Sequence, residues 1–164
     1  MLQARWTRIL TPLLLAVCLF VTACEQVETT TSPGTAPATQ TQAAAQPLRG
    51  GAFNRYFPKA SGDYNIVFSQ EKTGFAQAKL QQANQEVALL SVSDTANNPS
   101  AAAKFKESNP KIGGYPAMTQ GRGTAILVAD RFQVKVQSRV DSFTTADQKT
   151  WLEKFDLSGI SRLK

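Results

Sequence analysis

The sequence predicts an α+β domain, in which an antiparallel sheet of about six strands carries a short helix and a C-terminal helix packed on it. Residues 131–137 alternate strictly between polar and apolar side chains, which is typical of a half-buried antiparallel strand. Short apolar runs separated by turn residues precede this strand, and Trp151, Leu152 and Phe155 fall on one face of a helix near the C-terminus. The chain of 164 residues is long enough for one such domain with accessory segments.

The first three strands are expected over residues 63–68, 75–80 and 87–92, which are rich in β-branched, aromatic and aliphatic side chains. Glycine and asparagine in the connecting segments 72–74 and 83–85 favour tight turns. Because these connections are short, we expect the three strands to form an antiparallel meander.

A short helix is expected next, over residues 101–107. Asn98 is a favourable N-cap and Pro99 suits the first helical position. The Asn-Pro pair at residues 109–110 ends the helix, because proline cannot continue it.

The next strands follow a turn-rich passage at residues 112–116 and a tight turn at residues 121–123. One strand is expected over residues 125–129, with Asp130 and Arg131 at the corner that leads into the alternating strand. These two strands therefore form a hairpin.

The C-terminal helix is expected to begin near Thr145, because Gln148 three residues later completes a capping box. Ser158 and Gly159 provide its end. Trp151 lies on its apolar face, which we expect to pack on the sheet.

The first 23 residues have the features of a secretory signal peptide. Arg5 and Arg8 provide the positive charge that precedes an apolar run at residues 13–21, and this run is shorter than the ~20 residues that span a bilayer. A single-span membrane anchor is the less favoured alternative.

The stretch Val21-Thr22-Ala23-Cys24 resembles the lipobox of bacterial lipoproteins. The resemblance implies that the signal peptide is removed before Cys24 and that Cys24 carries fatty acyl chains such as palmitate, which hold the protein on a membrane on the periplasmic or another extracytoplasmic side. Glu25 differs from the aspartate that retains some lipoproteins at the inner membrane, so the outer membrane is slightly favoured. An ordinary secretory peptide with an incidental cysteine is the alternative.

A tether is expected over residues 24–49, and the globular domain over residues 50–164. The tether is rich in Thr, Ala, Gln and Pro, and such a segment buries too little apolar surface to fold by itself. Residues 49–164 hold 16 basic and 10 acidic side chains, so the folded part carries the net charge of +6.

The composition excludes several kinds of catalytic site. The chain has no histidine, which excludes Ser-His-Asp triads and histidine-ligated metals, and its two cysteines cannot form a four-cysteine site. No cofactor or metal ion is expected. We therefore predict that the protein is not an enzyme, with a hydrolase based on carboxylates or a Ser-Lys pair as an unfavoured alternative.

Three cations form the candidate binding site of the domain. Arg131 and Lys135 lie on the polar side of the alternating strand and Arg139 follows it, so they could form a patch for anionic lipid, an acidic polysaccharide or an acidic protein. A solvated strand face without a partner is the alternative, and nucleic acid is not expected as a partner outside the cytoplasm.

The predicted function is that of a membrane-anchored, non-catalytic binding or accessory module of the cell envelope or of a membrane complex. The alternative is a carrier or sensor of a small ligand, which would lie in a cavity between the sheet and the terminal helix, beside Phe132, Val134, Trp151 and Phe155.

The second half of the chain is similar to uncharacterised exported bacterial domains. The resemblance rests on Asp-Arg-Phe-x-Val-x-Val at residues 130–136 and on Phe-Asp-Leu-x-x-Ile at residues 155–160. It implies a hairpin followed by a terminal helix, and no activity.

Overall fold

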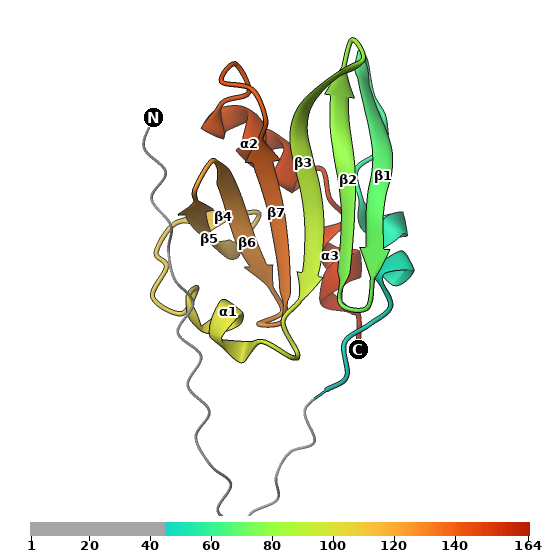
Figure 1. Ribbon diagram of the computed structural model, residues 1–164. Coiled ribbons are helices and arrows are strands. Elements are labelled where there is room, and N and C mark those ends of the chain that lie inside the picture. The colour runs from blue at the N-terminus through green and yellow to red at the C-terminus, as the bar shows by residue number, and fades with distance from the viewer. Residues whose placement is uncertain (1–44) are drawn as a thin grey trace, which may run out of the picture. The chain divides into compact units, whose positions relative to one another are not determined.

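A seven-stranded antiparallel sheet forms the body of the protein (Figure 1). The computed structural model describes residues 45–164, so the predicted signal peptide, Cys24 and most of the predicted tether lie outside the described residues. In chain order, the elements are η1 (Gly50–Tyr56), β1 (Tyr64–Lys72), β2 (Phe75–Gln82), β3 (Gln85–Asp94), α1 (Pro99–Ala103), β4 (Lys111–Ile112), β5 (Tyr115–Gln120), β6 (Gly123–Val128), β7 (Phe132–Ser138), α2 (Thr145–Glu153) and α3 (Leu157–Ser161).

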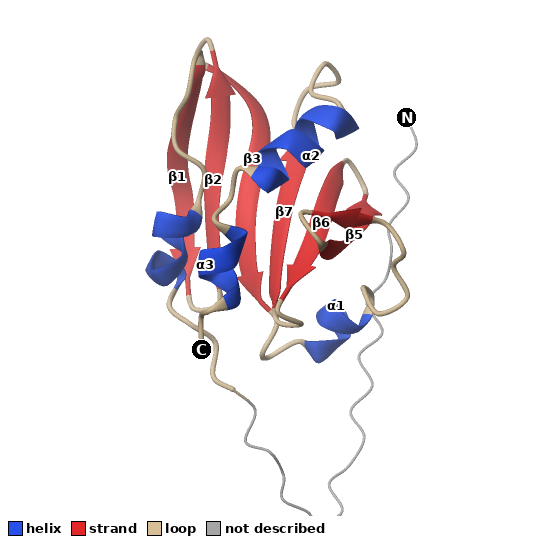
Figure 2. Cartoon of the chain, turned by 180° about the vertical axis from the view of Figure 1, so that it is seen from behind, coloured by secondary structure: helices blue, strands red, loops and turns tan. Residues whose placement is uncertain are grey.

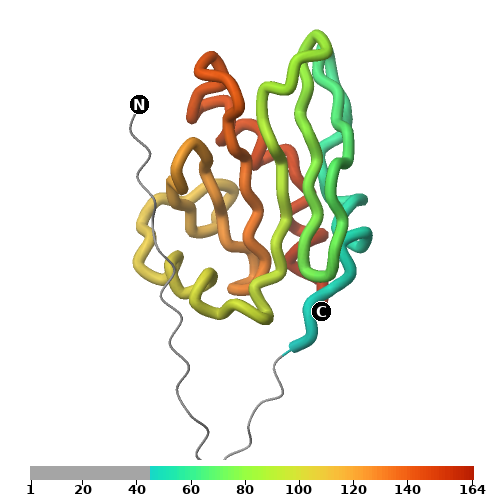
Figure 3. Tube along the Cα trace, in the orientation of Figure 1, coloured from blue at the N-terminus to red at the C-terminus, as the bar shows by residue number. Residues whose placement is uncertain are grey.

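The strands are ordered β1-β2-β3-β7-β6-β5-β4, and each pairs with its neighbours in antiparallel orientation. The tube in Figure 3 follows the predicted meander β1-β2-β3 and then the return of the chain through β5 and β6 to β7. The alternating strand β7 thus lies at the centre of the sheet, beside β3. The predicted antiparallel sheet is confirmed, with seven strands instead of about six.

The passage that was predicted to be rich in turns contains a short hairpin. β4 has only two residues, and they pair with Tyr115 and Pro116 of β5. Gly113 and Gly114 form the turn with positive φ angles of 57° and 86°, which glycine adopts without strain. A two-residue strand shows no alternation, and a proline argues against a strand, so the sequence pattern did not reveal this pair.

Helices cover one face of the sheet (Figure 2). The inward side chains of the strands pack there against η1, α2 and α3, which contribute Phe53, Trp151 and Leu152 to the main core. The predicted packing of the C-terminal helix on the sheet is confirmed. Phe105, just after α1, packs on Leu127 of β6 at the opposite face, so no described helix covers that face over β1, β2, β3 and β7.

Two hairpin turns use left-handed backbone conformations at non-glycine residues. Ala83 and Asn84 join β2 to β3 with φ angles of 47° and 65°, and Ala129 and Asp130 join β6 to β7 with φ angles of 51° and 53°. Two successive positive φ angles match the twist of the flanking strands. β6 therefore ends at Val128, one residue before the predicted end.

The first helix is shorter than predicted. Asn98 is the N-cap and Pro99 the first helical residue, as expected, although the Asn98 side chain makes no capping hydrogen bond. The helix ends at Ala103, and the predicted continuation to residue 107 is wrong because Phe105 leaves the helical path and is buried.

The capping box of α2 lies one residue before the predicted position. The Thr144 hydroxyl accepts the N–H of Asp147 at 3.3 Å, and a carboxylate oxygen of Asp147 accepts the N–H of Thr144 at 2.7 Å. The expected pair of Thr145 and Gln148 does not form, because Gln148 is buried between α2 and the sheet.

The C-terminal helix is interrupted. α2 ends at Glu153, and the predicted stop at Ser158 and Gly159 is wrong because both residues lie within α3. Asp156 caps α3 by accepting the N–H of Gly159 at 2.7 Å. Glycine is required there because a Cβ atom would clash with the ring of Tyr56.

The folded part begins a few residues before the predicted boundary at residue 50. Leu48 donates its N–H to Oδ2 of Asp94 at 3.0 Å, and its carbonyl accepts the N–H of Gly74 at 2.6 Å. The carbonyl of Gln46 accepts a hydrogen bond from Arg131 at 3.0 Å. The last residues of the predicted tether therefore belong to the folded domain, although they form no strand.

Within residues 45–164, no helix is both long enough and apolar enough to cross a bilayer.

Candidate functional site

The three predicted cations, Arg131, Lys135 and Arg139, lie in or directly beside β7. Eight residues separate the first from the last, which amounts to about 26 Å along an extended strand at ~3.3 Å per residue. A small anion cannot touch all three, so they can act together only on an extended partner.

Arg131 is held by Asp94, the last residue of β3. Its Nε lies 2.9 Å from Oδ1 and its Nη2 lies 2.8 Å from Oδ2, a bidentate ion pair. The Asp94 side chain is fully buried, and the Arg131 side chain is 19% exposed. Together with the bonds to residues 46–48, this pair forms a connection that we call the Asp94 latch.

The latch lowers the pKa of Asp94. Burial by itself would raise this pKa, but the hydrogen bonds from Arg131, from the backbone N–H groups of Leu48 and Ala96, and the charge of Arg131 together outweigh burial. The same hydrogen bond raises the pKa of Arg131. Arg131 is therefore part of the structural framework and is not a free cation.

Arg139 also has a partner. Its Nε lies 3.0 Å from Oε1 of Glu86, and Nζ of Lys79 lies 3.1 Å from the other oxygen of the same carboxylate. Glu86 thus bridges two cations at one end of the sheet. The side chains of Arg139 and Lys79 are 51% and 44% exposed, so solvent screens these pairs.

Lys135 differs from the two arginines, because no described carboxylate forms an ion pair with it. It lies between Ser91 of β3 and Ala125 of β6, where the part of the sheet that no described helix covers meets the part under Phe105. Its side chain extends over Gly123, where a Cβ atom would lie only 2.9 Å from the lysine Cε. Glycine at this position therefore leaves room for the lysine stem.

Side chains of β2, β3 and β7 form the centre of the face that no described helix covers, and Lys135 lies on its β7 side. We call this surface the open face, and it consists of the residues of β1, β2, β3 and β7 that point away from the helices. Its central rows, read across the register, are Phe75, Ser93 and Gln133; Gln77, Ser91 and Lys135; and Lys79, Leu89 and Gln137. Amide and hydroxyl side chains predominate in these rows. The sequence did not reveal this surface, because the pairing of the strands decides which side chains lie next to each other, and no single strand shows that pairing.

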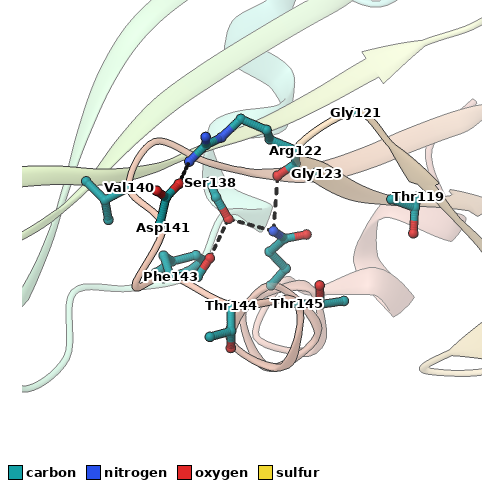
Figure 4. Close-up of a pocket in the computed structure, with 11 residues that line it drawn as sticks. Thr119, Gly121, Arg122, Gly123, Ser138, Val140, Asp141, Phe143, Thr144 and Thr145 are labelled. Atoms are coloured by element: carbon teal, nitrogen blue, oxygen red, sulfur yellow. Dashed lines mark hydrogen bonds and ion pairs between the residues drawn. The ribbon is translucent and has the colours of Figure 1, made fainter.

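A separate polar cluster fixes α2 to the sheet, beside a hollow of about 250 Å³ (Figure 4). The Gln148 amide donates to the Ser138 hydroxyl at 2.6 Å and to the Arg122 carbonyl at 3.1 Å, and its oxygen accepts from Thr124 at 2.7 Å. The Ser138 hydroxyl in turn donates to the Phe143 carbonyl at 2.6 Å.

This cluster has the properties of a structural network. Gln148, Thr124 and Ser138 are buried, and each has the hydrogen bonds that burial requires. The Ser138 hydroxyl donates to a backbone carbonyl instead of a base, so nothing activates it as a nucleophile. Arg122 and Asp141 form an exposed ion pair of 2.6 Å at the rim.

Other chemistry among the described residues is limited. Residues 45–164 contain no cluster of three or more metal-ligating side chains. Asp147, like Asp94, has a lowered pKa, in this case through the hydrogen bonds from Thr144, so neither carboxyl resembles a general acid with a raised pKa.

The four residues that would flank the predicted ligand cavity lie in the core of the described domain. Phe132, Val134, Trp151 and Phe155, which would flank it, are at most 4% exposed and pack against each other in the main core. Four surface hollows are lined by other side chains.

Comparisons with known proteins give no match: no family model, no curated protein and no solved structure is similar to this chain. Lipidation of Cys24, which lies outside the described residues, stays a prediction from the sequence.

Proposed function

We propose that the protein is a membrane-anchored lipoprotein that acts as a non-catalytic binding module of the cell envelope. The observation that carries this proposal is the open face, a broad sheet surface that no helix of residues 45–164 covers, opposite the face on which the helices and the main core pack (Figures 1 and 2). A sheet face of this kind is free to bind a partner.

The charge of the open face favours an acidic protein partner. Lys72, Lys79 and Lys135 point out from it, Arg139 borders it, and Glu86 is the carboxylate among them. Cations thus exceed carboxylates by three, and complementary charge guides association with an acidic surface. The surrounding glutamine and serine side chains supply hydrogen bonds of the kind found in polar interfaces.

The Asp94 latch supports the proposed anchoring. It binds residues 46–48 to the ends of β3 and β7, the two central strands. A tether that leads from lipid on Cys24 would therefore be attached at one end of the two central strands. The open face would stay accessible while the domain is held at the membrane.

Lipidation is tested by labelling cells with radioactive palmitate. We expect the wild type to incorporate the label and the Cys24→Ser variant to lose it together with membrane association. Absence of label in the wild type, or label in Cys24→Ser, contradicts the anchor.

Partner binding is tested with a photo-crosslinking residue at Gln77, which lies on the open face beside Ser91. We expect one stoichiometric crosslinked protein with an acidic surface, and its loss in Lys135→Glu. Lys149→Glu is the matched control, because Lys149 is an exposed residue of α2 on the helix-covered side. Equal crosslinking in both charge variants would contradict docking through the open face.

A further inference from the structure

A second concave surface lies on the helix-covered side, between the end of η1 and the junction of α2 and α3. It is a hollow of about 510 Å³, lined by Arg55, Phe57, Pro58, Lys59, Lys154 and Asp156. None of the features in the proposed function uses this hollow.

The hollow is positively charged. Arg55, Lys59 and Lys154 come from η1, the segment after it and the end of α2, and no described carboxylate forms an ion pair with any of them. Asp156 is the one acid of the lining, and its Oδ1 already accepts the N–H of Gly159 at 2.7 Å and the hydroxyl of Ser158 at 3.1 Å. Two positive charges therefore remain in excess.

Aromatic rings hold two of these cations in place. Nζ of Lys154 lies 4.0 Å from the ring centre of Trp151, and the guanidinium carbon of Arg55 lies 5.1 Å from that of Tyr56. Cations over aromatic faces gain electrostatic attraction and lose some freedom. The hollow thus presents its charge in a partly ordered arrangement.

An exposed aromatic residue continues the floor of the hollow. The ring of Phe57 contacts that of Phe68 in β1 at 5.1 Å between centroids, and Phe68 is 42% exposed. Among the described residues, the exposed large hydrophobic side chains are Phe68 and Val67. Val67 pairs with Lys79 and points to the open face, whereas Phe68 pairs with the buried Ala78 and lies on the helix-covered side, so Phe68 alone adds an exposed apolar surface next to the cations.

We propose that this surface docks on an anionic lipid bilayer, with headgroup phosphates at Arg55, Lys59 and Lys154 and with Phe68 at the boundary of the acyl chains. Cations beside exposed aromatic side chains suit the membrane interface, where an apolar group is buried next to anionic headgroups. A free anion would match the charges but would leave the exposed Phe68 without a role.

The entry of the chain supports a membrane as the occupant, and this step rests on the proposed anchoring through Cys24. The chain joins the domain at residues 46–48, and η1 leads from there to the hollow over seven residues, about 14 Å at ~2 Å per residue of 3-10 helix. The point where the chain enters the domain and the hollow are therefore close to each other, and the open face, on the other side of the sheet, remains available to a partner.

The proposal is tested with the chain from residue 24 carrying Cys24→Ser, which contains every described residue and no lipid. Cosedimentation is measured with vesicles of phosphatidylglycerol and phosphatidylcholine (1:1) and with vesicles of phosphatidylcholine alone. We expect binding to the anionic vesicles that weakens with salt. In the double variant Lys59→Gln/Lys154→Gln, binding should fall about fivefold for each cation removed.

The matched control is Lys104→Gln/Lys106→Gln, which removes the same charge from exposed lysines after α1. It should retain binding, while Phe68→Ser should weaken binding to the anionic vesicles. Equal loss in both double variants would reduce the effect to general attraction by the net charge and would overturn the proposal. Absence of vesicle binding at low salt would also overturn it.

Trp151 gives a second, local measurement, because it is the only tryptophan of the chain after residue 24. We expect its fluorescence to change with anionic vesicles and to stay constant with inorganic phosphate. A saturable response to phosphate alone would identify a small-anion site and overturn docking on the bilayer. The Cys24→Ser chain carries no lipid, so the vesicle assay is independent of palmitate labelling and of partner crosslinking. Vesicle binding can fail while these two assays succeed, and it can succeed while they fail.

Discussion

The substitution Asp94→Asn tests the latch that joins the entering chain to the central strands. The carboxylate accepts four hydrogen bonds, two from Arg131 and one each from the backbone N–H groups of Leu48 and Ala96. An asparagine side chain has one oxygen, and its NH₂ group faces donors, so at least two of these bonds are lost.

The expected loss of stability is about 3 kcal/mol. Removing one partner of a buried ion pair costs about 3–5 kcal/mol, because the remaining charge stays desolvated. The lower end applies because Asp94 is fully buried but Arg131 is 19% exposed. For a domain of this size, we expect the melting temperature to fall by about 12 °C, at roughly 4 °C per kcal/mol.

The pH dependence gives an independent measurement. The pKa of Asp94 is lowered in the folded state from its ordinary value of 3.8, so its ionised form stabilises the fold above that pH. This stabilisation is lost as the pH falls through the lower folded pKa. In urea titrations, the difference between wild type and Asp94→Asn should be full at pH 7 and should shrink below about pH 4.

Asp141→Asn is the matched control, because it breaks an ion pair of 2.6 Å whose side chains are 57% and 95% exposed. Solvent screens that pair, so the melting temperature should barely change. Trypsin should cleave after Arg49 faster in Asp94→Asn than in either the wild type or the control. Equal melting temperatures for the two variants would refute the assignment of the latch as a stabilising element.

Three further substitutions test the packing of the C-terminal helices. Trp151→Ala should destabilise the protein by about 3–5 kcal/mol in urea unfolding, because the side chain is only 3% exposed, and an unchanged midpoint would place the ring outside the core. Gln148→Leu should cost about 2–4 kcal/mol by leaving Ser138 without its buried partner, and a neutral result would contradict the hydrogen-bond network of Figure 4. Gly159→Ala should lower the melting temperature through a clash with Tyr56, whereas an unchanged value would show that the ring can move aside.

The alternation of polar and apolar residues at 131–137 predicted strand β7 and the side of it on which Arg131 and Lys135 lie. Both the existence of a strand and the direction of its side chains can be derived from one segment alone. The partners of those cations are properties of the whole sheet. Asp94 lies 37 residues before Arg131 and Glu86 lies 53 residues before Arg139, and only strand register brings each pair together. The sequence therefore predicted a patch of three cations, whereas in the described part of the chain Lys135 is the one of the three without an ion pair.

The boundary of the tether shows a second limit of reasoning from composition. The docking of residues 46–48 uses backbone groups, with the N–H of Leu48 on Asp94 and its carbonyl on Gly74. Every residue except proline has these groups, so no side-chain pattern distinguishes a docked segment from a free one. A boundary drawn where apolar periodicity begins will accordingly fall too late wherever a chain enters a fold through its backbone. In this protein the latch at residues 46–48 precedes η1 in the chain. A force that pulls on the entering chain therefore acts on β3 and β7 through the latch before it can detach η1 from the sheet.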